Sequence, residues 1–183
     1  MHGFYPCNLK GNAIKNYIST RDHHTASLNE DGTVIYLSLN GKGLYKYDIT
    51  TEEHELLLSA SNEEDRFYAT LSQNPHYVYI QEGGNSIIYD LTERKDYPVE
   101  FVVLGILENG KAWYRDNDDY KVYVVDFKSG DKEVLLDHSD EEGGRDYRLE
   151  TIDVSYDGST LYYTREKDDD IVLMKKDISN LTK

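Results

Sequence analysis

Runs of acidic residues are the part of this sequence with the clearest capacity for chemistry. Asp116-Asn117-Asp118-Asp119 and Asp168-Asp169-Asp170 each place several hard oxygen ligands close together, as Ca²⁺ prefers. Neither run contains the glycine and the distal glutamate of an EF-hand loop. Adjacent side chains on a hairpin also point in different directions, so three in a row seldom hold one ion unaided. We therefore expect exposed turn acids and no cofactor, with a Ca²⁺ site as the alternative.

The other reactive side chains form no catalytic motif. His23-His24 follow Asp22, but neighbours on a strand face opposite ways and no second histidine pair lies at a supporting spacing. Gly-x-Ser-x-Gly does not occur, which argues against a hydrolase nucleophile elbow. Gly83-Gly84 and Gly143-Gly144 precede no helix that begins with Lys-Ser or Lys-Thr, so tight turns explain them better than phosphate binding. We assign no catalytic residue and expect a protein that is not an enzyme.

The elements that position these acids follow from the composition and the apolar pattern. The 183 residues are enough for one domain with a sizeable core, and tyrosine is abundant at 17 residues. Tyr, Val, Ile and Thr favour strands. No apolar run has a convincing helical period, so the sequence predicts an all-β fold. Four runs have strand length and are bounded by turn residues: Thr33–Leu37, Tyr77–Ile80, Lys121–Val125 and Thr160–Tyr163.

A repeat of turns and strands organises these runs. The pairs Asp31-Gly32, Asn74-Pro75, Asn109-Gly110 and Asp157-Gly158 each precede an apolar-aromatic strand, at spacings of 43, 35 and 48 residues. A later strand in each repeat ends in Asp, as in Leu44–Asp48. A period of about 42 residues with several short strands predicts a β-propeller of four-stranded antiparallel blades. In the first complete repeat we expect strands at Thr25–Leu28, Thr33–Leu39, Gly43–Ile49 and His54–Leu58.

We expect a single propeller domain over residues 1–183 with about four blades. The repeats fall at approximately 1–18 (partial), 19–58, 59–99, 100–138 and 139–183. The last repeat has only its first three strands, and Ala13–Ile18 would complete its sheet in a closed small ring. The surplus strand at Phe4–Leu9 instead favours a segment of a larger propeller, and both interpretations stay open. Open flanks in the second case predict self-association.

The repeats resemble bacterial propellers of the TolB-like and low-density-lipoprotein-receptor-like (YWTD) type. The shared form is Asp-Gly before a strand with paired aromatics, followed by an apolar strand that ends in Tyr-x-x-Asp or a similar sequence. It is found at Asp31–Tyr36 with Leu44–Asp48, and again at Asp157–Tyr163. The YWTD tetrad itself does not occur, and Trp113–Asp116 is its nearest echo. The resemblance implies a protein- or ligand-binding scaffold outside the cytoplasm or in the cell envelope, and it transfers no catalytic residue.

Charge is the main guide to partners. The chain has 20 Lys+Arg and 35 Asp+Glu, and its formal net charge of −15 disfavours nucleic acids and anionic membranes. No apolar run is long enough for a membrane-spanning helix, and the first ten residues lack the features of a secretory signal. Cys7, the single cysteine, excludes an internal disulfide and is expected to be a small buried residue. The favoured partner is a protein or small ligand of basic character.

Most of the excess negative charge falls on one face of the predicted propeller. Connections between blades and turns between second and third strands share that face, and their 49 positions hold 18 Asp/Glu and 7 Lys/Arg. The other 134 positions hold 17 Asp/Glu and 13 Lys/Arg. Such a face attracts basic partners, whereas the alternative is that loop acids merely solubilise the protein. The binding residues proposed on this basis are Glu63, Glu64, Asp65, Asp116, Asp118, Asp119, Asp140, Glu141, Glu142, Asp168 and Asp169.

The sequence therefore predicts a non-catalytic β-propeller module that binds a protein or a small ligand. The alternative is the propeller part of a larger enzyme, such as a prolyl-oligopeptidase-type peptidase, with its catalytic domain elsewhere. Trp113 and Tyr114, on a predicted second strand, are expected to pack between blades, with a groove for a sugar or peptide as the alternative. The longest connection between blades, Asp137–Gly144, is expected to be a solvated loop, with a mobile binding loop as the alternative.

Overall fold

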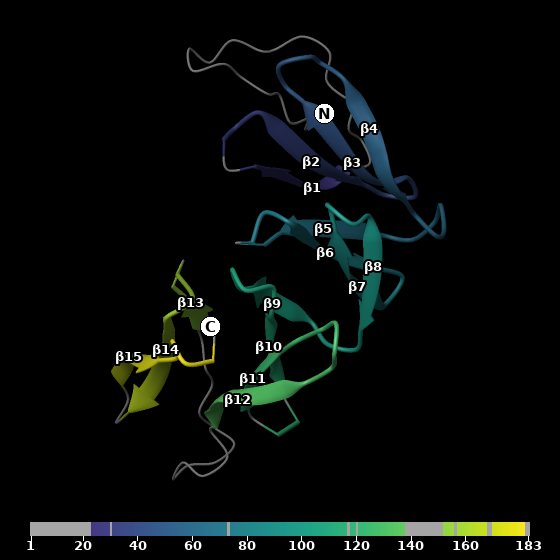
Figure 1. Ribbon diagram of the computed structural model, residues 1–183. Helices are drawn as coiled ribbons and strands as arrows, with labels where there is room; N and C mark the ends of the chain where they lie inside the picture. Colours follow the sequence, from purple (N-terminus) through teal and green to yellow (C-terminus); the bar gives the residue numbers. More distant parts are fainter. Residues whose placement is uncertain are drawn as a thin grey trace. The chain divides into compact units, whose positions relative to one another are not determined.

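Every regular element of the described chain is a β-strand. The computed structural model describes residues 23–29, 31–72, 74–116, 118–119, 121–137, 152–155, 157–167 and 170–181. Within these ranges fifteen strands form four antiparallel sheets and no helix occurs (Figure 1). It follows that the described part contains no helix able to cross a membrane. The predicted all-β class is confirmed.

Each sheet is built from strands that follow one another in the chain. The first sheet contains β1 (His23–Leu28), β2 (Val34–Leu39), β3 (Gly43–Asp48) and β4 (His54–Ser59). The second contains β5 (Phe67–Leu71), β6 (Tyr77–Glu82), β7 (Asn85–Asp90) and β8 (Lys95–Val99). The third contains β9 (Val103–Ile106), β10 (Ala112–Asp116), β11 (Lys121–Val125) and β12 (Lys132–Asp137). The last sheet has three strands in the described chain, β13 (Ile152–Val154), β14 (Thr160–Lys167) and β15 (Asp170–Asp177).

The strand order agrees with the predicted repeat. All four strands expected in the first repeat are present, with ends within two residues of the predicted ones. In the described residues the last repeat has three strands, the number that the sequence indicated. The segments Phe4–Leu9 and Ala13–Ile18, together with Cys7, lie outside the described residues, as does most of the connection that begins at Asp137.

The turn pairs that marked the repeat lie between the first and second strands of each sheet. In the first sheet Gly32 N donates to Asn29 O (3.1 Å), and the Asp31 carboxylate accepts from Thr33 N (2.9 Å). Gly32, Gly110 and Gly158 have φ of 73°, 83° and 68°. Glycine adopts this left-handed conformation without the strain that a Cβ would cause. Turn chemistry therefore explains why these dipeptides recur.

A second recurring turn joins the third strand of a sheet to the fourth. Asp48 Oδ1 accepts from Thr50 N (2.8 Å) and Thr51 N (3.0 Å). Asp90 and Asp126 accept from the residues two and three positions later in the same way, at distances of 2.8 to 3.2 Å. The residues four positions after these aspartates have positive φ: Glu52 (61°), Arg94 (53°) and Gly130 (86°). The Asp that ends the third strand is thus a turn-forming residue.

The chain divides into two compact units, and each has its own apolar core. Unit 1 contains the first two sheets, and unit 2 contains the last two with the turn of residues 72–77. In unit 1 the buried core consists of Leu44, Phe67, Ala69, Val78, Ile80 and Tyr89. The Tyr89 hydroxyl donates to Leu57 O of β4 (3.0 Å), so a hydrogen bond also joins these two sheets.

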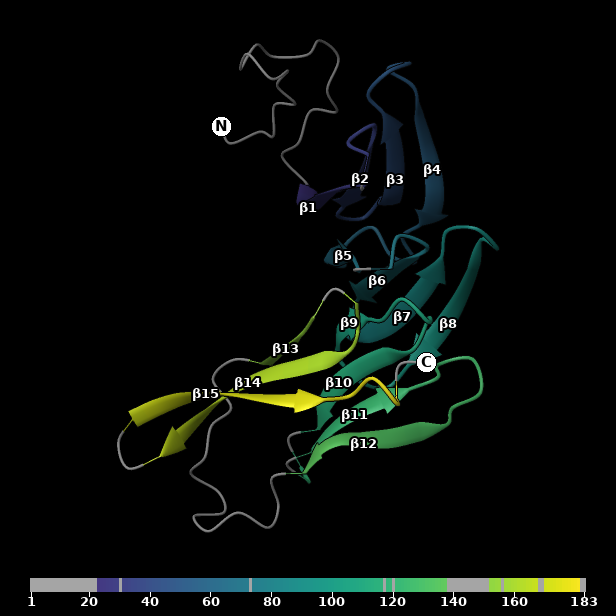
Figure 2. The same ribbon diagram turned by 60° about the vertical axis from the view of Figure 1, so that its left-hand side comes forward.

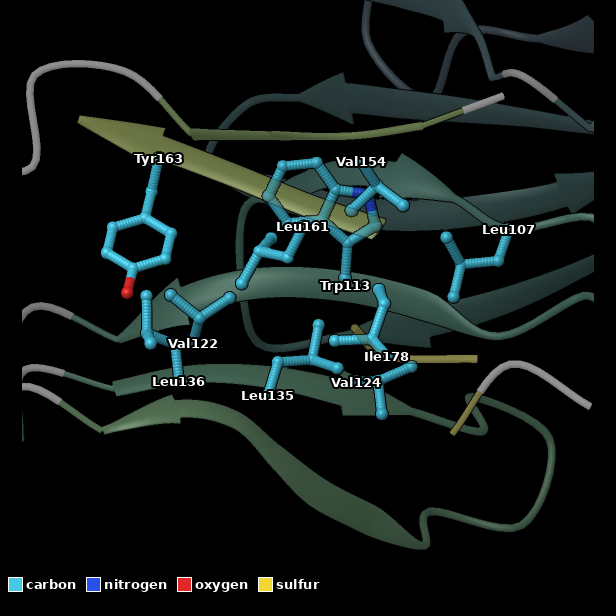
Figure 3. Packing of buried hydrophobic residues seen from close by; sticks show 10 residues of the cluster. All are labelled: Leu107, Trp113, Val122, Val124, Leu135, Leu136, Val154, Leu161, Tyr163 and Ile178. Atoms are coloured by element: carbon cyan, nitrogen blue, oxygen red, sulfur yellow. The ribbon is translucent and has the colours of Figure 1, made fainter. Parts of the chain in front are cut away.

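In unit 2 the third and fourth sheets pack face to face. Trp113 of β10 and Leu135 of β12 belong to one buried cluster with Leu161 of β14 and Val154 of β13 (Figure 3). Trp113 is only 3% exposed. Its predicted role in packing between blades is therefore confirmed, and it lines no accessible groove. Each sheet covers apolar surface that its neighbour could not bury alone.

Candidate functional site

The strand order places the predicted acidic residues at one end of their own sheets. In an up-and-down sheet, the turn between the second and third strands lies at the same end as the exit from the fourth strand. We call this the acidic end. In the described chain it comprises residues 40–42, 60–66 and 82–85 in unit 1, and residues 100–102, 115–116, 118–119, 121, 137, 166–167 and 170 in unit 2. The opposite end carries the two recurring turn types described above.

In unit 1, a glutamate at the end of β6 holds the acidic loop of residues 60–66. Ser61 N and Ser61 Oγ donate to the two carboxylate oxygens of Glu82, at 2.5 and 2.9 Å. Asn62 N also donates to Glu82 (3.3 Å). At the other end of the loop, Phe67 N donates to Asn40 Oδ1 (2.9 Å). The backbone of the loop is therefore anchored to the two neighbouring hairpin turns.

Two glycines allow this loop to lie directly against those turns. A Cβ on Gly41 would lie 2.2 Å from the carbonyl oxygen of Glu63, and a Cβ on Gly83 would lie 2.5 Å from Asp65 Oδ2. Both glycines also have positive φ, 62° and 55°. The side chains of Glu63 and Glu64 are exposed, and Asp65 is half-buried. The loop thus presents two carboxylates to solvent from a backbone that is held at both ends.

In unit 2, three predicted site residues bond within their own turn. Asp116 Oδ1 accepts from Asp118 N (2.9 Å), and Asp119 Oδ1 accepts from Lys121 N (3.1 Å). Asp119 Oδ2 accepts a short hydrogen bond from the hydroxyl of Tyr123. Asp118 is exposed, whereas Asp116 and Asp119 are half-buried. Asp118 is therefore the carboxylate of this turn that is most accessible to a partner.

Tyr123 belongs to this site although the sequence did not indicate it. Its hydrogen bond to Asp119, and then its burial, raise the pKa of Tyr123 to about 12. The Tyr123 ring stacks on Tyr114 with centroids 5.4 Å apart, and Lys132 Nζ lies 4.4 Å from the Tyr123 centroid. The only sequence signal was an Asp four residues before a Tyr across a hairpin, which is too common a spacing to identify a pair.

These acids do not gather into a metal site in the part of the chain that the structure describes. No group of three or more His, Cys, Asp or Glu side chains there could hold an ion. Closeness in sequence between Asp116, Asp118 and Asp119 therefore does not bring their carboxylates to one point. The other five predicted site residues, Asp140, Glu141, Glu142, Asp168 and Asp169, lie outside the described residues and stay predictions.

The described residues carry about half of the predicted charge excess. At the acidic end the described positions hold eleven Asp/Glu and five Lys/Arg. The described turns of the opposite end hold eight Asp/Glu and three Lys/Arg. At both ends some of these acids accept backbone bonds within their turns: Asp31, Asp126 and Asp157 at the opposite end, and Asp116 and Asp119 at the acidic end. Glu63 and Glu64 instead extend outward from theirs.

Comparison with known proteins places the chain in a class of fold. No family model and no curated protein sequence matches it. The β-propeller domain of Cps50 (Swd1) from Myceliophteria thermophila is similar, with 15% identity and a TM-score of 0.60, over 91% of this chain and 55% of that chain. Oligogalacturonate lyase from Vibrio parahaemolyticus matches with 10% identity and a TM-score of 0.56, over 82% and 47%. TolB from Acinetobacter baumannii matches with 16% identity and a TM-score of 0.50, over 93% and 44%.

These likenesses and the four antiparallel sheets define a β-propeller fold. TolB is among the similar structures, so the TolB-like part of the resemblance is supported at the level of the fold, whereas the YWTD type stays a prediction. The chain spans about half the length of the propeller chains that it matches. At 10 to 16% identity the similarity concerns the fold alone, so the activity of the lyase is not transferred.

Proposed function

We propose that this chain is a non-catalytic β-propeller module that binds a basic protein or ligand at the acidic end of its sheets. One observation carries the proposal: Glu63 and Glu64 are exposed on a loop whose backbone is anchored through Glu82 and Asn40. Charges on a backbone that is already ordered lose less conformational freedom when a partner docks than charges on a loose loop. Electrostatic attraction to a chain of formal charge −15 also speeds the encounter with a cationic partner.

The test uses a lysine decamer as a cationic probe and a glutamate decamer as its anionic counterpart. The double variant Glu63→Gln/Glu64→Gln removes the two exposed charges from the acidic loop without changing its backbone anchors. The matched control, Glu53→Gln/Glu108→Gln, removes two exposed charges from turns at the opposite end. Both variants change the net charge equally, so any difference between them reports where the probe binds.

We expect the lysine decamer alone to bind, with a Kd that rises steeply with salt. At ~0.5 kcal/mol for each exposed charge pair, the acidic-loop variant loses ~1 kcal/mol, which is a fivefold increase in Kd or slightly more. The control variant should stay within about twofold of the unchanged chain. Equal weakening in both variants, or no saturable binding at low salt, would remove the acidic loop as the binding surface.

A calcium measurement separates this proposal from the metal-site alternative. Thermal unfolding is followed in CaCl₂ and in NaCl of the same ionic strength. We expect the same shift in both, because screening of self-repulsion depends on ionic strength alone. A rise in Tm that only Ca²⁺ produces would mean that the ion binds the folded chain, and would replace the basic partner by a cation.

A further inference from the structure

The last sheet carries the two most exposed large apolar side chains of the described residues, Leu173 (68%) and Ile171 (61%). Strands β14 and β15 pair antiparallel over their whole length, so residues directly opposite one another share a side of the sheet. Leu173 lies opposite Thr164, and Tyr162 is on the same side because side chains alternate along a strand. Tyr162 is 41% exposed, whereas Leu161 points the other way into the core of unit 2. We call the side of Tyr162 and Leu173 the outward face of the last sheet.

The third sheet shows how such a face is used when another sheet covers it. The carbonyls of Lys111 and Thr160 close the turns before β10 and β14 by accepting equivalent backbone bonds, both of 2.8 Å. Two positions after these residues stand Trp113 in the third sheet and Tyr162 in the last. Trp113 is 3% exposed, because it packs in one cluster with side chains of the last sheet (Figure 3). Tyr162 thus occupies the position that a neighbouring sheet buries.

The next strand of each sheet shows the same contrast. Val122 of β11 lies opposite the residue two positions after Trp113, and it is 0% exposed. Leu173 of β15 lies opposite the residue two positions after Tyr162, and it is 68% exposed. The outward face therefore has the residue pattern of a contact between sheets, although it stays exposed in the described chain.

The first sheet offers no matching free face in a second copy. Its side away from the core of unit 1 holds Leu37, Leu39 and Tyr47, which are only 9%, 3% and 5% exposed. A head-to-tail contact between the last sheet of one copy and the first sheet of another is therefore blocked. Among the described sheets, the free apolar face that a second copy can offer is the same outward face.

Charges on the outward face are arranged so that they complement the same face of another copy. Asp153 of the edge strand β13 and Lys175 of the edge strand β15 both lie directly opposite Tyr162, one on each side of it (Figure 2). Both charged residues are exposed. A two-fold rotation about an axis along β14 exchanges the two edge strands across a contact of this kind. It places each Asp153 against Lys175 of the other copy, with the two Tyr162 side chains between the ion pairs.

From this arrangement we infer that two copies of the chain form a two-fold symmetric dimer through the outward face of the last sheet. A two-fold contact uses the same patch on both copies, which requires a patch that complements itself. Burial of the apolar side chains drives the association, and the opposite charges fix its register. The face is about 10 Å wide between its edge strands and about 26 Å long, since β15 has eight residues. A contact of this size buries less than the ~1,200 Å² of standard specific interfaces, so we expect a weak dimer.

Sedimentation equilibrium of the whole chain at 20 µM to 1 mM tests the inference, in 150 mM NaCl to screen the repulsion between copies of charge −15. We expect the average mass to rise from 21.2 kDa toward twice that value over this range. Leu173→Lys should raise the dimer dissociation constant about tenfold or more, because it puts a charge into an apolar contact. Val102→Lys is the matched control, which adds the same charge at a side chain that is 56% exposed and lies between β8 and β9. It should stay within about twofold of the unchanged chain. If Leu173→Lys does not fold, judged by far-UV circular dichroism, Ile171→Lys takes its place.

A charge exchange tests the two-fold arrangement itself. Asp153→Lys and Lys175→Asp should each weaken the dimer about tenfold, because each turns both ion pairs into repulsive pairs. Asp153→Lys also lowers the net negative charge, so overall repulsion cannot cause its effect. In a mixed pair of the two variants, opposite charges meet again at both positions, and the mixture should dimerise about as tightly as the unchanged chain.

Two results would overturn the inference. A folded chain that stays monomeric at 1 mM would do so, and would leave the outward face to a different partner. A dimer that Leu173→Lys does not weaken, or a mixture of the charge variants no tighter than either variant alone, would do so as well. Such a dimer would use another contact, such as pairing between the edges of two β15 strands.

Discussion

Replacing Gly105 with alanine should destabilise unit 2, because Trp113 occupies the space that the new methyl group would need. Gly105 of β9 lies directly opposite Trp113 of β10. An added Cβ would lie 2.4 Å from Trp113 Nε1 and 3.1 Å from Cε2. The indole is 3% exposed and lies in one buried cluster with Val154 and Leu161 (Figure 3), so it has little room to move away.

The size of the effect follows from two opposing terms. Forcing extra atoms into a well-packed core costs about 1–3 kcal/mol, while the Gly-to-Ala change itself recovers ~0.4–1 kcal/mol by restricting the unfolded chain. The expected net loss in the free energy of unfolding is about 0–2.6 kcal/mol, which lowers Tm by up to ~10 °C for a chain of this size. Urea unfolding followed by circular dichroism measures the loss. Emission from Trp113, the single tryptophan, reports whether the indole moves.

Two comparison variants make this prediction specific. Gly84→Ala adds a methyl group in open space at a φ of 88°, so it should cost stability through backbone strain and leave the tryptophan emission unchanged. Trp113→Phe removes the Nε1 atom that clashes, so its combination with Gly105→Ala should be less destabilising than the sum of the two single changes. The reasoning is refuted if Gly105→Ala leaves both stability and emission as they are.

Three further predictions concern the turns and the acidic end. Asn74 is 4% exposed, and its Nδ2 donates to Leu107 O (3.1 Å) and Glu108 O (3.0 Å). Asn74→Ala should therefore lower the free energy of unfolding, measured in urea, by about 1–3 kcal/mol. No loss of stability would mean that water replaces the amide. The raised pKa of Tyr123 contributes stability below pH ~10 that is lost as the pH rises toward 12. The Tyr123→Phe variant should therefore lose less stability between pH ~10 and 12 than the unchanged chain. If the free energy of unfolding depended on pH in the same way in both proteins, the hydrogen bond to Asp119 would be contradicted. Backbone bonds from Thr51 and Thr50 hold the pKa of Asp48 below its usual value, so this carboxylate stabilises the fold above pH ~3.8 and the contribution is lost as the pH falls through its lowered pKa. With Asp48→Asn, the free energy of unfolding should fall less steeply as the pH decreases through this range. An unchanged pH dependence would show that other groups cause the loss.

Local structure was predictable where a residue type has one strong conformational use. Asp31-Gly32 and its counterparts could be assigned to turns because glycine supplies positive φ and Asp accepts nearby backbone N–H groups. Alternating and aromatic runs then indicated the strands of the first repeat to within two residues. Stacking between sheets followed from the same pattern, because a single four-stranded sheet cannot cover its own apolar faces.

The candidate site was predictable only in outline. Strand order decides at which end of its sheet each acid lies, so Glu63 and Asp118 could be placed from the repeat alone. The bonds of Ser61 to Glu82 join residues 21 positions apart, and no local pattern specifies such a partner. Nor could spacing show that Asp119 bonds to Tyr123 instead of sharing an ion with its neighbours. Side-chain direction at a turn depends on tertiary contacts that local propensity does not encode.

A titration followed by ¹H–¹⁵N nuclear magnetic resonance tests the central claim, binding at the acidic end, most directly. The lysine decamer is added to the whole chain at 50 mM NaCl, and backbone amide shifts are recorded to saturation. We expect the largest shifts in residues 61–66 around Glu63 and Glu64, with residues 50–53 and 107–111 at the opposite end almost unaffected. Shifts of equal size at both ends, or largest at the opposite end, would contradict it.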